Sequence, residues 1–427
     1  MTFKISEDIK IELYGSTSFI IGQSILGGPA LLGDLSPTWH PLTCGVVSVD
    51  IERGFSVNQG IVPSLEVGTA NIVLSGFDVD PTLNPLFQID GQIKVLVREP
   101  GQTNFSPIFV GFIDNMETTY ESNGLITTTL TCTDWIPKIM NITVPEGAYV
   151  APAEGFSTRV NRVLDDFVLP RYPDIEISPA WFLEFGGSQF PQEGDLDAFG
   201  NPEPNTGTRA ATTVGDLLNE LMQGEAGMIV VSRTGVIYGY GRYYISDYLL
   251  EELDLGTVPT SYGFSNVHST SLDHYCMANI ETSSGKADIV NELILGFSDT
   301  VPFPAFEDEK VNIKNEASIG AVGSIAFEGN LYVDLGPETN PTLYLQSWGE
   351  DITFPESSTR VKSLTWSPIR RDGLLNSSWK FDPGYDVTRV RIEYPGHTID
   401  GKYMVSKVTH NITAENWLMG AELWKGA

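Results

Sequence analysis

Cysteine is scarce in this sequence, and the few cysteines are far apart. There are 3 in 427 residues, at Cys44, Cys132 and Cys276. An odd number without a close pair excludes a dense disulfide framework and lacks the short spacings of a zinc cluster. We therefore expect thiols that are buried and behave as small core hydrophobes.

Long hydrophobic runs are also missing. No apolar segment approaches the roughly 20 residues that a helix needs to cross a bilayer, and the first residues lack the pattern of a secretory leader. The sequence therefore predicts a protein that is neither inserted in a membrane nor exported by the usual route. A hydrophobic content of 41% with 11% aromatic residues predicts a globular chain with packed interiors. Its 427 residues should divide into about two to four domains.

Positive charge is the third deficit. The chain has 25 Lys and Arg against 55 Asp and Glu, a formal net charge of -30. Nucleic-acid binding depends on cationic contacts to phosphate, so this balance argues against a protein whose main task is to bind DNA or RNA. An acidic surface that keeps the protein dispersed is the simplest explanation.

The motifs of the common enzyme classes are absent as well. The five histidines are His40, His268, His274, His397 and His410. They form no H-E-x-x-H pair, and there is no G-x-S-x-G, no P-loop and no G-x-G-x-x-G after a predicted strand. Paired carboxylates such as Asp165 and Asp166 are a weak argument for a hydrolase, because acids are abundant throughout. We predict no catalytic, cofactor-binding or metal-binding residues and a protein that is not an enzyme.

Two features resemble functional sites but have simpler explanations. Asp78 and Asp80 lie in a turn segment that lacks the glycine and the final glutamate of an EF-hand, so we expect turn-forming aspartates. His410 has the strand parity of Val408 and Ile412, so we expect a histidine hydrogen-bonded within a β module and not a general base.

Alternating apolar and polar residues dominate the first third of the chain. Apolar residues occupy one strand face in the runs 9–13, 47–51, 70–74, 93–97, 108–112 and 126–132. Asn123 and Gly124 predict a tight hairpin with positive φ at both central positions. Short antiparallel strands with one apolar face each predict a small closed β-barrel, since an open sheet would leave that face unprotected.

Helical spacing replaces alternation after Trp135. Apolar residues from 160 to 167 predict an amphipathic helix with Ser157 as its N-cap, and Thr213 opens a second helix. A hairpin over 228–240 follows directly. The segment 186–208, rich in Gly, Pro, Asp and Asn, predicts a long exposed loop.

Strand patterns return after residue 265. They cover 277–280, 291–295, 362–366, 387–394 and 403–423. We therefore predict a mainly β fold with an α/β middle segment and two β-barrel-like modules. The domains are residues 1–140, 141–260 and 261–427, the last with an inserted segment near 313–360. The two β modules should be related by an approximate rotation, and Trp417 should be a buried anchor of the last hairpin.

Several stretches together resemble a known family. The strand runs within 46–135 and the closing segment 403–417 are similar to tail hub proteins of tailed bacteriophages, also called baseplate hub or minor tail proteins. The helix and hairpin of 213–242 and the segment 315–323 resemble the middle of the same family. The likeness spans nearly the whole chain, although no catalytic signature is part of it.

The resemblance implies a structural protein of the virion, located at the distal end of the tail and assembled in the cytoplasm of the host bacterium. It implies a homotrimer that joins the tail tube and the distal tail protein ring to the tip or central fibre, with the tape-measure protein as a further partner. Phage DNA would pass through its lumen without specific binding. No cofactor and no membrane insertion are implied. Because the chain stops at Ala427 directly after the last strand pattern, lytic or receptor-binding activities would belong to partner proteins.

Two other functions stay open. A distal tail ring protein would have a similar N-terminal strand pattern without the α/β middle segment, and it would be a hexamer. A carbohydrate-binding adhesin of the tail tip would use Trp181, Trp348 or Trp379 as sugar platforms, whereas core tryptophans are the simpler explanation. The sequence does not identify the partner that docks on the loop 186–208.

The charge leads to one further expectation. Acidic walls would not hold a passing DNA duplex, whereas cationic walls would bind it. Like charges are costly in a desolvated subunit interface. We expect acidic side chains on the lumen and outer rim, and interfaces where basic residues lie beside acids.

Overall fold

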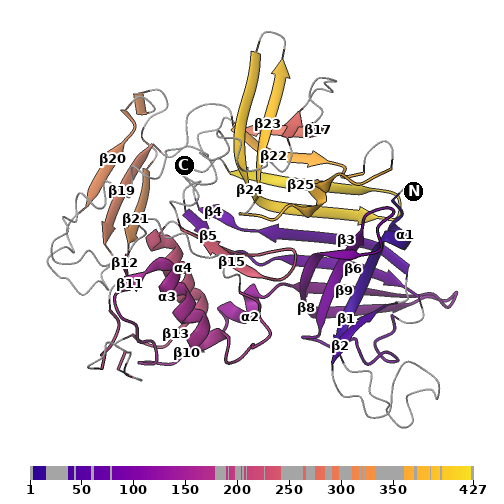
Figure 1. Ribbon diagram of the computed structural model, residues 1–427, viewed down its shortest axis with the longest axis horizontal. Coiled ribbons are helices and arrows are strands. Elements are labelled where there is room, and N and C mark those ends of the chain that lie inside the picture. Colours follow the sequence, from indigo (N-terminus) through magenta and orange to yellow (C-terminus); the bar gives the residue numbers. More distant parts are fainter. Residues whose placement is uncertain are drawn as a thin grey trace.

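A computed structural model gives the fold of the chain (Figure 1). It describes residues 3–15, 37–42, 45–58, 62–76, 79–177, 189–190, 192–197, 203, 206–207, 209–225, 227–241, 263–265, 275–283, 291–297, 310–316, 319–320, 324, 326–331, 360–369, 373–384, 386–394 and 397–424. The structural statements below concern these residues.

The N-terminal strands form an antiparallel sheet in the order β3-β6-β9-β8-β7-β1-β2. They are β1 (Ile9–Gly15), β2 (Thr38–Pro41), β3 (Gly45–Gly54), β6 (Thr69–Ser75), β7 (Gln92–Arg98), β8 (Phe105–Tyr120) and β9 (Ile126–Thr133). Each predicted run lies in one of these strands. Alternation explains this, because residues two apart share a face and one face of this sheet is buried in a common core.

Two bulges change the faces that the alternation predicted. A register shift between Val46 and Ser48 leaves Val47 44% exposed instead of buried with Val49. A second shift, where β8 pairs with β7, leaves Ile108 without a partner, so Val110 and Phe112 face away from Ile108. An extra residue in one strand reverses the side-chain parity beyond it, and local periodicity does not reveal where that residue is.

The hairpin between β8 and β9 has a longer loop than predicted. The Glu121 N–H donates to the Leu125 carbonyl at 2.8 Å, so the loop spans 121–125. Gly124 has a φ of 86°, whereas Asn123 does not have a positive φ. The Asn123 side chain instead accepts from the Leu125 N–H at 2.8 Å. The expected positive φ at both positions is therefore wrong for Asn123, which supports the turn through its side chain.

The C-terminal strands continue the N-terminal sheet. They are β16 (Gly263–Ser265), β17 (Tyr275–Met277), β18 (Asn279–Ser283), β22 (Arg360–Trp366), β23 (Val387–Tyr394), β24 (His397–Thr413) and β25 (Trp417–Trp424). Strand β24 pairs antiparallel with β3, from Lys407 opposite Gly54 to Thr413 opposite Ser48. The result is one 14-stranded sheet, whose N- and C-terminal parts lie next to each other in Figure 1.

No closed barrel forms among the described strands. The main path of the sheet ends at β2 on one side and at β17 on the other. One hydrophobic core, the sheet core, contains residues of both parts, including Ile72 and Leu130 from the first and Trp417 from the second. The mainly β fold with an α/β middle segment is confirmed. The small closed barrel is not found among the described strands. Strand β3 pairs with β24 as well as with β6, and this pairing protects the edge of β3.

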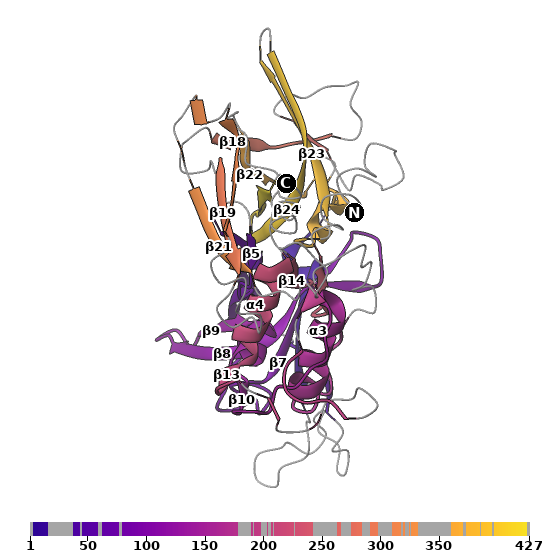
Figure 2. The same cartoon turned by 90° about the vertical axis from the view of Figure 1, so that its left-hand side faces the viewer.

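The middle of the chain forms a second hydrophobic core around helices. The elements are α2 (Ile136–Met140), α3 (Phe156–Val163), a π-helix (Leu164–Val168), α4 (Val214–Glu225), β14 (Met228–Val231) and β15 (Ile237–Tyr240). We call their apolar core the middle core. Helices α3 and α4 lie side by side in both views (Figures 1 and 2). Both predicted helices and the predicted hairpin are present.

The two helix starts differ in their capping. Gly155, not Ser157, is the N-cap of α3, and it makes no side-chain hydrogen bond. Thr213 and Asp216 cap α4 reciprocally, since the Thr213 hydroxyl accepts from the Asp216 N–H at 3.1 Å and the Asp216 carboxylate accepts from the Thr213 N–H at 3.2 Å. This is a capping box with aspartate at its second position, as the spacing indicated.

A separate three-stranded sheet packs on the middle core. It consists of β19 (Glu292–Phe297), β20 (Val311–Lys314) and β21 (Ala326–Leu331). Leu293 and Leu295 of β19 are fully buried in the middle core. The run 291–295 is therefore a strand, as predicted, but it does not belong to the C-terminal part of the large sheet. The domain boundaries near residues 140 and 260 stay predictions.

Short elements complete the described chain. They are α1 (Ile5–Asp8), β4 (Ser56–Asn58), β5 (Val62–Ser64), β10 (Thr143–Val144), β11 (Glu154–Gly155), β12 (Gln189–Phe190), β13 (Thr212–Thr213) and a 3-10 helix (Ser377–Lys380). Strands β11 and β12 and strands β10 and β13 each form a two-stranded sheet, which connects the predicted loop region to the helices.

Gly54→Ala is expected to weaken the pairing of β3 with β24. Gly54 has a φ of 151°, and a Cβ atom there would lie 2.2 Å from the Ser406 carbonyl oxygen. Backbone atoms cannot retreat like a flexible side chain, so we expect a loss of about 1–3 kcal/mol. Thermal unfolding measures it. Gly320→Ala is the control, because its Cβ would meet no atom within 4 Å; equal melting temperatures for both variants would contradict the prediction.

Candidate functional site

The side chains that could ligate a metal do not come together in the described residues. Within them, no three His, Cys, Asp or Glu side chains gather closely enough to hold a metal ion. Asp80 accepts from the Thr82 N–H at 2.9 Å and from the Tyr120 hydroxyl at 2.9 Å, as a turn-forming aspartate should.

Asp78 and Cys44 lie outside the described residues, and Cys132 is fully buried. None of the described helices combines the length and hydropathy of a membrane span.

His410 is buried in β24, as its strand parity indicated. It is 1% exposed, and its ring centroid lies 5.9 Å from that of Trp417. Neither ring nitrogen has a hydrogen-bond partner among the described residues, so the expected hydrogen bond is not found. Burial, together with the positive charges of Arg53 and Arg233, holds the pKa of His410 well below its ordinary value of 6.5.

We expect His410 to make the folded protein less stable in mild acid. Below about pH 6.5 the unfolded chain takes up a proton on His410 that the folded chain does not, so the unfolded state is favoured as pH falls. The contribution is about 1.4 kcal/mol between pH 7.5 and 5.5. Thermal unfolding of the wild type and of His410→Leu across this window measures it. The variant should lose less stability on acidification, and an identical pH profile would contradict the prediction.

A buried ion cluster joins the three parts of the chain. Arg53 on β3 is 3% exposed, and it donates through Nη1 to the Asp382 carboxylate at 2.8 Å and through Nη2 to the Phe381 carbonyl at 3.0 Å. Asp382 also accepts from the Arg233 N–H at 2.6 Å, and the two side chains form an ion pair at 3.3 Å. Arg233 belongs to the β14–β15 turn and donates to the Pro107 carbonyl at 2.9 Å. The N-terminal strands, the middle hairpin and the C-terminal segment thus meet at Asp382.

A buried carboxylate supports this cluster from the N-terminal side. Asp134 accepts from the Gly68 N–H and from the Ile136 N–H, both at 2.9 Å. Burial raises the pKa of Asp134 to about 7, and these two hydrogen bonds and the charge of Arg53 oppose that shift. A side chain at position 68 would place its Cβ 2.5 Å from the Asp134 carboxylate. Gly68 therefore lets the end of β9 and the start of α2 approach the β6 strand.

A second buried network fixes the middle core. Arg159 on α3 is fully buried and donates to Glu154 Oε1 at 2.9 Å and to the Pro152 carbonyl at 2.6 Å. Arg162, one turn along, donates to both oxygens of the same glutamate at 2.7 and 2.8 Å. Burial raises the pKa of Tyr149 to about 12, so its hydroxyl stays protonated and accepts from Arg159 at 3.3 Å. Glu154 thus pairs with two arginines, and this network ties α3 to the segment that precedes it.

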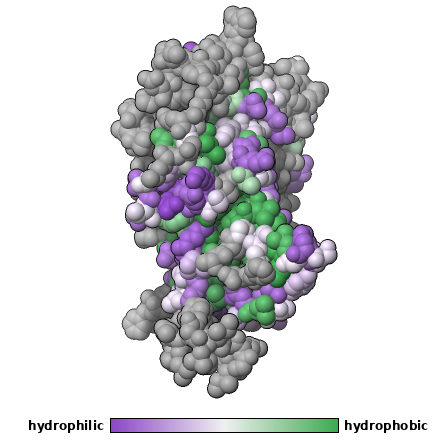
Figure 3. All heavy atoms as spheres, turned by 90° about the vertical axis from the view of Figure 1, so that its right-hand side faces the viewer, coloured by the Kyte–Doolittle hydropathy of each residue, from purple (hydrophilic) through white to green (hydrophobic). Residues whose placement is uncertain are grey.

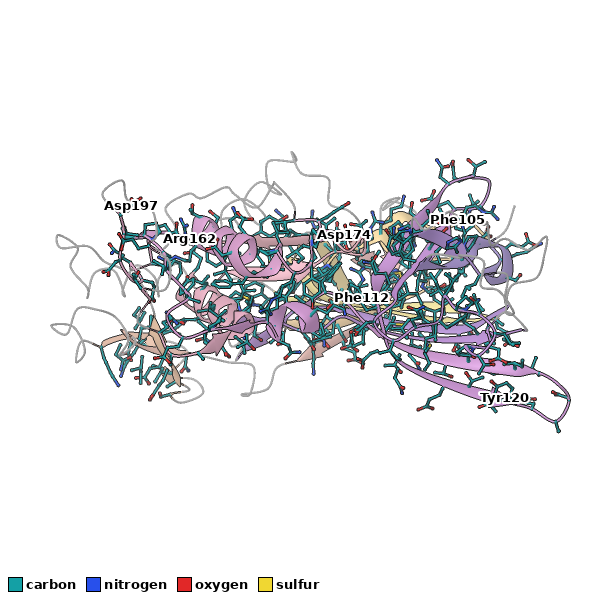
Figure 4. The ribbon with its side chains drawn as sticks, turned by 90° about the horizontal axis from the view of Figure 1, so that it is seen from below. Phe105, Phe112, Tyr120, Arg162, Asp174 and Asp197 are labelled. Carbon is teal, nitrogen blue, oxygen red and sulfur yellow. The ribbon has the colours of Figure 1, made fainter. Side chains whose placement is uncertain are left out.

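Two hairpins project from the large sheet. The β8–β9 hairpin extends to the right in Figure 1, and Tyr120 lies near its tip in Figure 4. Large apolar side chains are exposed at this end: Leu83 is 76% exposed, Tyr120 57% and Leu125 42%. The β23–β24 hairpin projects at the top of Figure 1. Seen from the side of the β8–β9 hairpin, the surface has a hydrophobic area bordered by hydrophilic residues (Figure 3), which favours contacts with other proteins.

The structure describes one of the three tryptophans that an adhesin would use, and that one is not a sugar platform. Trp379 is 1% exposed and packs in the sheet core. Trp181 and Trp348 lie outside the described residues. Trp379 is therefore a core tryptophan.

Sequence reasoning did not find the ion cluster, although one indication was present. Arg53 has the parity of Val49 and Ile51, so a charged residue occupies the apolar face of a predicted strand. A buried charge requires a partner. Its partner Asp382 is 329 residues away, and no local pattern connects the two.

Comparisons with known proteins agree with this geometry. No protein-family model matches the chain, and no curated protein sequence matches it. Among solved structures, a tail protein from Neisseria meningitidis superposes with a TM-score of 0.54 at 12% identity, covering 97% of this chain and 95% of that one. The 43 kDa tail protein of prophage MuSo2 from Shewanella oneidensis has a TM-score of 0.54 at 10% identity, covering 97% and 98%. The chain therefore has the fold of phage tail proteins, in agreement with the resemblance to tail hub proteins found in its sequence.

Proposed function

We propose that this protein is a structural subunit of a phage tail, the hub at its distal end. In this proposal it forms a homotrimer that joins the tail tube and the distal tail protein ring to the tip or central fibre. The observation that carries the proposal is the fold likeness to two phage tail proteins over 97% of the chain. A fold alone does not define a function, so the position in the tail needs its own test.

The connections between the parts of the chain support a structural role that transmits force. The N- and C-terminal strands share one sheet through the β3–β24 pairing, and Asp382 connects them to the middle hairpin. Force on either end would be carried by backbone hydrogen bonds and buried ion pairs, not by a flexible linker. We propose residues 1–140, 141–260 and 261–427 as the modules that contact different neighbours in the tail.

The assembly state separates the hub from its main alternative. Three chains of 46.8 kDa would have a mass of about 140 kDa, whereas a hexameric distal tail ring would have about twice that mass. Light scattering coupled to size-exclusion chromatography of the full chain measures the mass. A trimer supports the hub. A hexamer would contradict the hub and support the distal tail ring protein.

The position in the virion is tested separately. Gold-labelled antibodies against this protein should bind at the tail end far from the capsid in electron micrographs of intact phage particles. Label along the tail tube or at the capsid would contradict the proposal. The proposed tape-measure, ring and fibre partners should be recovered by cross-linking from the same particles.

The charge distribution forms part of the proposal. Three copies at -30 each would give the trimer a strongly negative charge, and we propose that DNA passes through its channel without specific binding. Within the subunit, basic side chains already lie beside acids, as Lys407 does between Glu52 and Glu66, both at 2.8 Å. The surface potential of an assembled tail should be negative in the lumen. A lumen lined mainly by Lys and Arg would contradict this part.

A further inference from the structure

A cleft of about 230 Å³ lies between the outer face of the N-terminal sheet and the middle part of the chain. Its floor belongs to strands β1, β2, β7 and β8, and its other side to the segment around Asp174 and the β14–β15 turn. Figure 4 shows Asp174 between the helices on one side and the strands on the other. Junctions between structural units are common places for small-ligand sites.

Strand register explains the composition of the floor. Trp39 is opposite Tyr14, and their ring centroids are 5.1 Å apart. Lys94 is opposite Glu12 on one side and Val110 on the other. Because Glu12 and Tyr14 share a face of β1, the aromatic pair and Lys94 lie on the same outer face. Three adjacent strands thus present two rings and one ammonium group to the cleft.

The opposite wall contributes carboxylates. Asp174 and Glu176 line the cleft and are exposed. The Ile237 N–H donates to the Glu176 carbonyl at 2.9 Å, and Ile177 forms a bridge with Ile237. The backbone of this wall is therefore fixed on β15, while among the described residues Asp174 and Glu176 make no side-chain hydrogen bond or ion pair.

Lys94 is the unusual residue of the cleft. Its ammonium group lies 3.8 Å above the centre of the Trp39 ring. Among the described residues it has no hydrogen bond or ion pair, because its neighbour Glu12 is paired with Lys10 at 2.5 Å. Burial lowers the pKa of Lys94, although the nearby acids oppose this. The chain has 55 acids, yet Lys94 is partly buried without an ion-pair partner among the described residues. Its N–H donors are therefore available to a ligand.

The charges of the cleft define the class of ligand. A simple anion would be repelled by Asp174 and Glu176, and a simple cation by Lys94. A neutral ring with hydroxyl groups satisfies both walls, since it accepts from Lys94 and donates to the carboxylates. Lys94 covers one face of Trp39, so the apolar face of the ligand would pack on Tyr14 or Trp135, which also line the cleft. We propose that this cleft binds one pyranose sugar residue. Its volume is below the roughly 300 Å³ at which sites for larger ligands begin, which favours a single ring.

Titration of the full-length protein with D-glucose, D-galactose and N-acetyl-D-glucosamine tests the proposal. Tryptophan fluorescence and calorimetry should show saturable binding of at least one of the three sugars. Lys94→Met keeps an unbranched apolar side chain at this position but removes the N–H donors, and it should weaken binding about tenfold. Asp174→Asn, at an exposed position, should weaken it as well. Lys4→Met is the control, because Lys4 is exposed and lies outside the cleft lining, and this variant should bind like the wild type.

Three results would overturn the proposal. They are the absence of saturable binding for all three sugars, binding that both Lys94→Met and Asp174→Asn leave unchanged, and binding of zwitterionic glycine in place of the sugars. Equal melting temperatures of wild type and variants establish that a loss of binding is local. The outcome does not depend on the assembly state, so it stands apart from the proposed hub function.

Discussion

Asp382→Ala is expected to destabilise the protein by about 3–5 kcal/mol, because it leaves a buried arginine without its counter-charge. Arg53 is 3% exposed, and Asp382 is its ion-pair partner at 2.8 Å. The same carboxylate holds the β14–β15 turn through the Arg233 N–H. The variant should therefore loosen the contact between the sheet and the middle hairpin as well as lower the melting temperature. Thermal unfolding and hydrogen exchange of β14 and β15 measure the two effects.

Two control variants separate the buried charge from general damage. Asp382→Asn keeps the shape and an acceptor oxygen, so a loss of similar size would show that the charge itself is required. Lys4→Ala removes an ion pair with Glu7 in which both side chains are 59% exposed, and such pairs contribute about 0–1 kcal/mol. If Asp382→Ala unfolded at the same temperature as Lys4→Ala, the cluster would have no role in holding the parts together.

Trp417→Ala should have a comparable effect on the sheet core. Trp417 at the start of β25 is fully buried, as the sequence predicted, with ring centroids 5.4 Å from Phe3 and 5.9 Å from His410. Truncating a packed tryptophan costs about 3–5 kcal/mol. The cavity would lie between the N-terminal segment and the last hairpin. Chemical denaturation followed by circular dichroism measures the loss.

The neighbouring residue provides the control for this variant. Leu418 is on the same strand but is 40% exposed, so Leu418→Ala should change stability by no more than about 0.5 kcal/mol. Comparable losses for both variants would mean that truncation in β25 disturbs the strand itself. A stable Trp417→Ala protein would contradict the anchoring role.

Local patterns in the sequence determined much of the secondary structure. Alternation identified the strands around Ile11, Ile72 and Val95, and helical spacing with the Thr213 cap identified α4. These elements could be predicted because period and capping act between residues a few positions apart. The charge balance argued against a protein whose main task is to bind nucleic acid. The family resemblance depended on the same local patterns, and it agreed with the fold.

Tertiary structure decided how these elements meet. The pairing of β3 with β24, the bulges beside Val47 and Ile108, and the ion pair of Arg53 with Asp382 each depend on segments that are distant in the chain or on one extra residue in a strand. Alternation specifies which face of a strand is apolar, but not which strand lies next to it. The predicted closed barrel was therefore replaced, among the described strands, by one sheet in which the C-terminal hairpin protects the N-terminal edge.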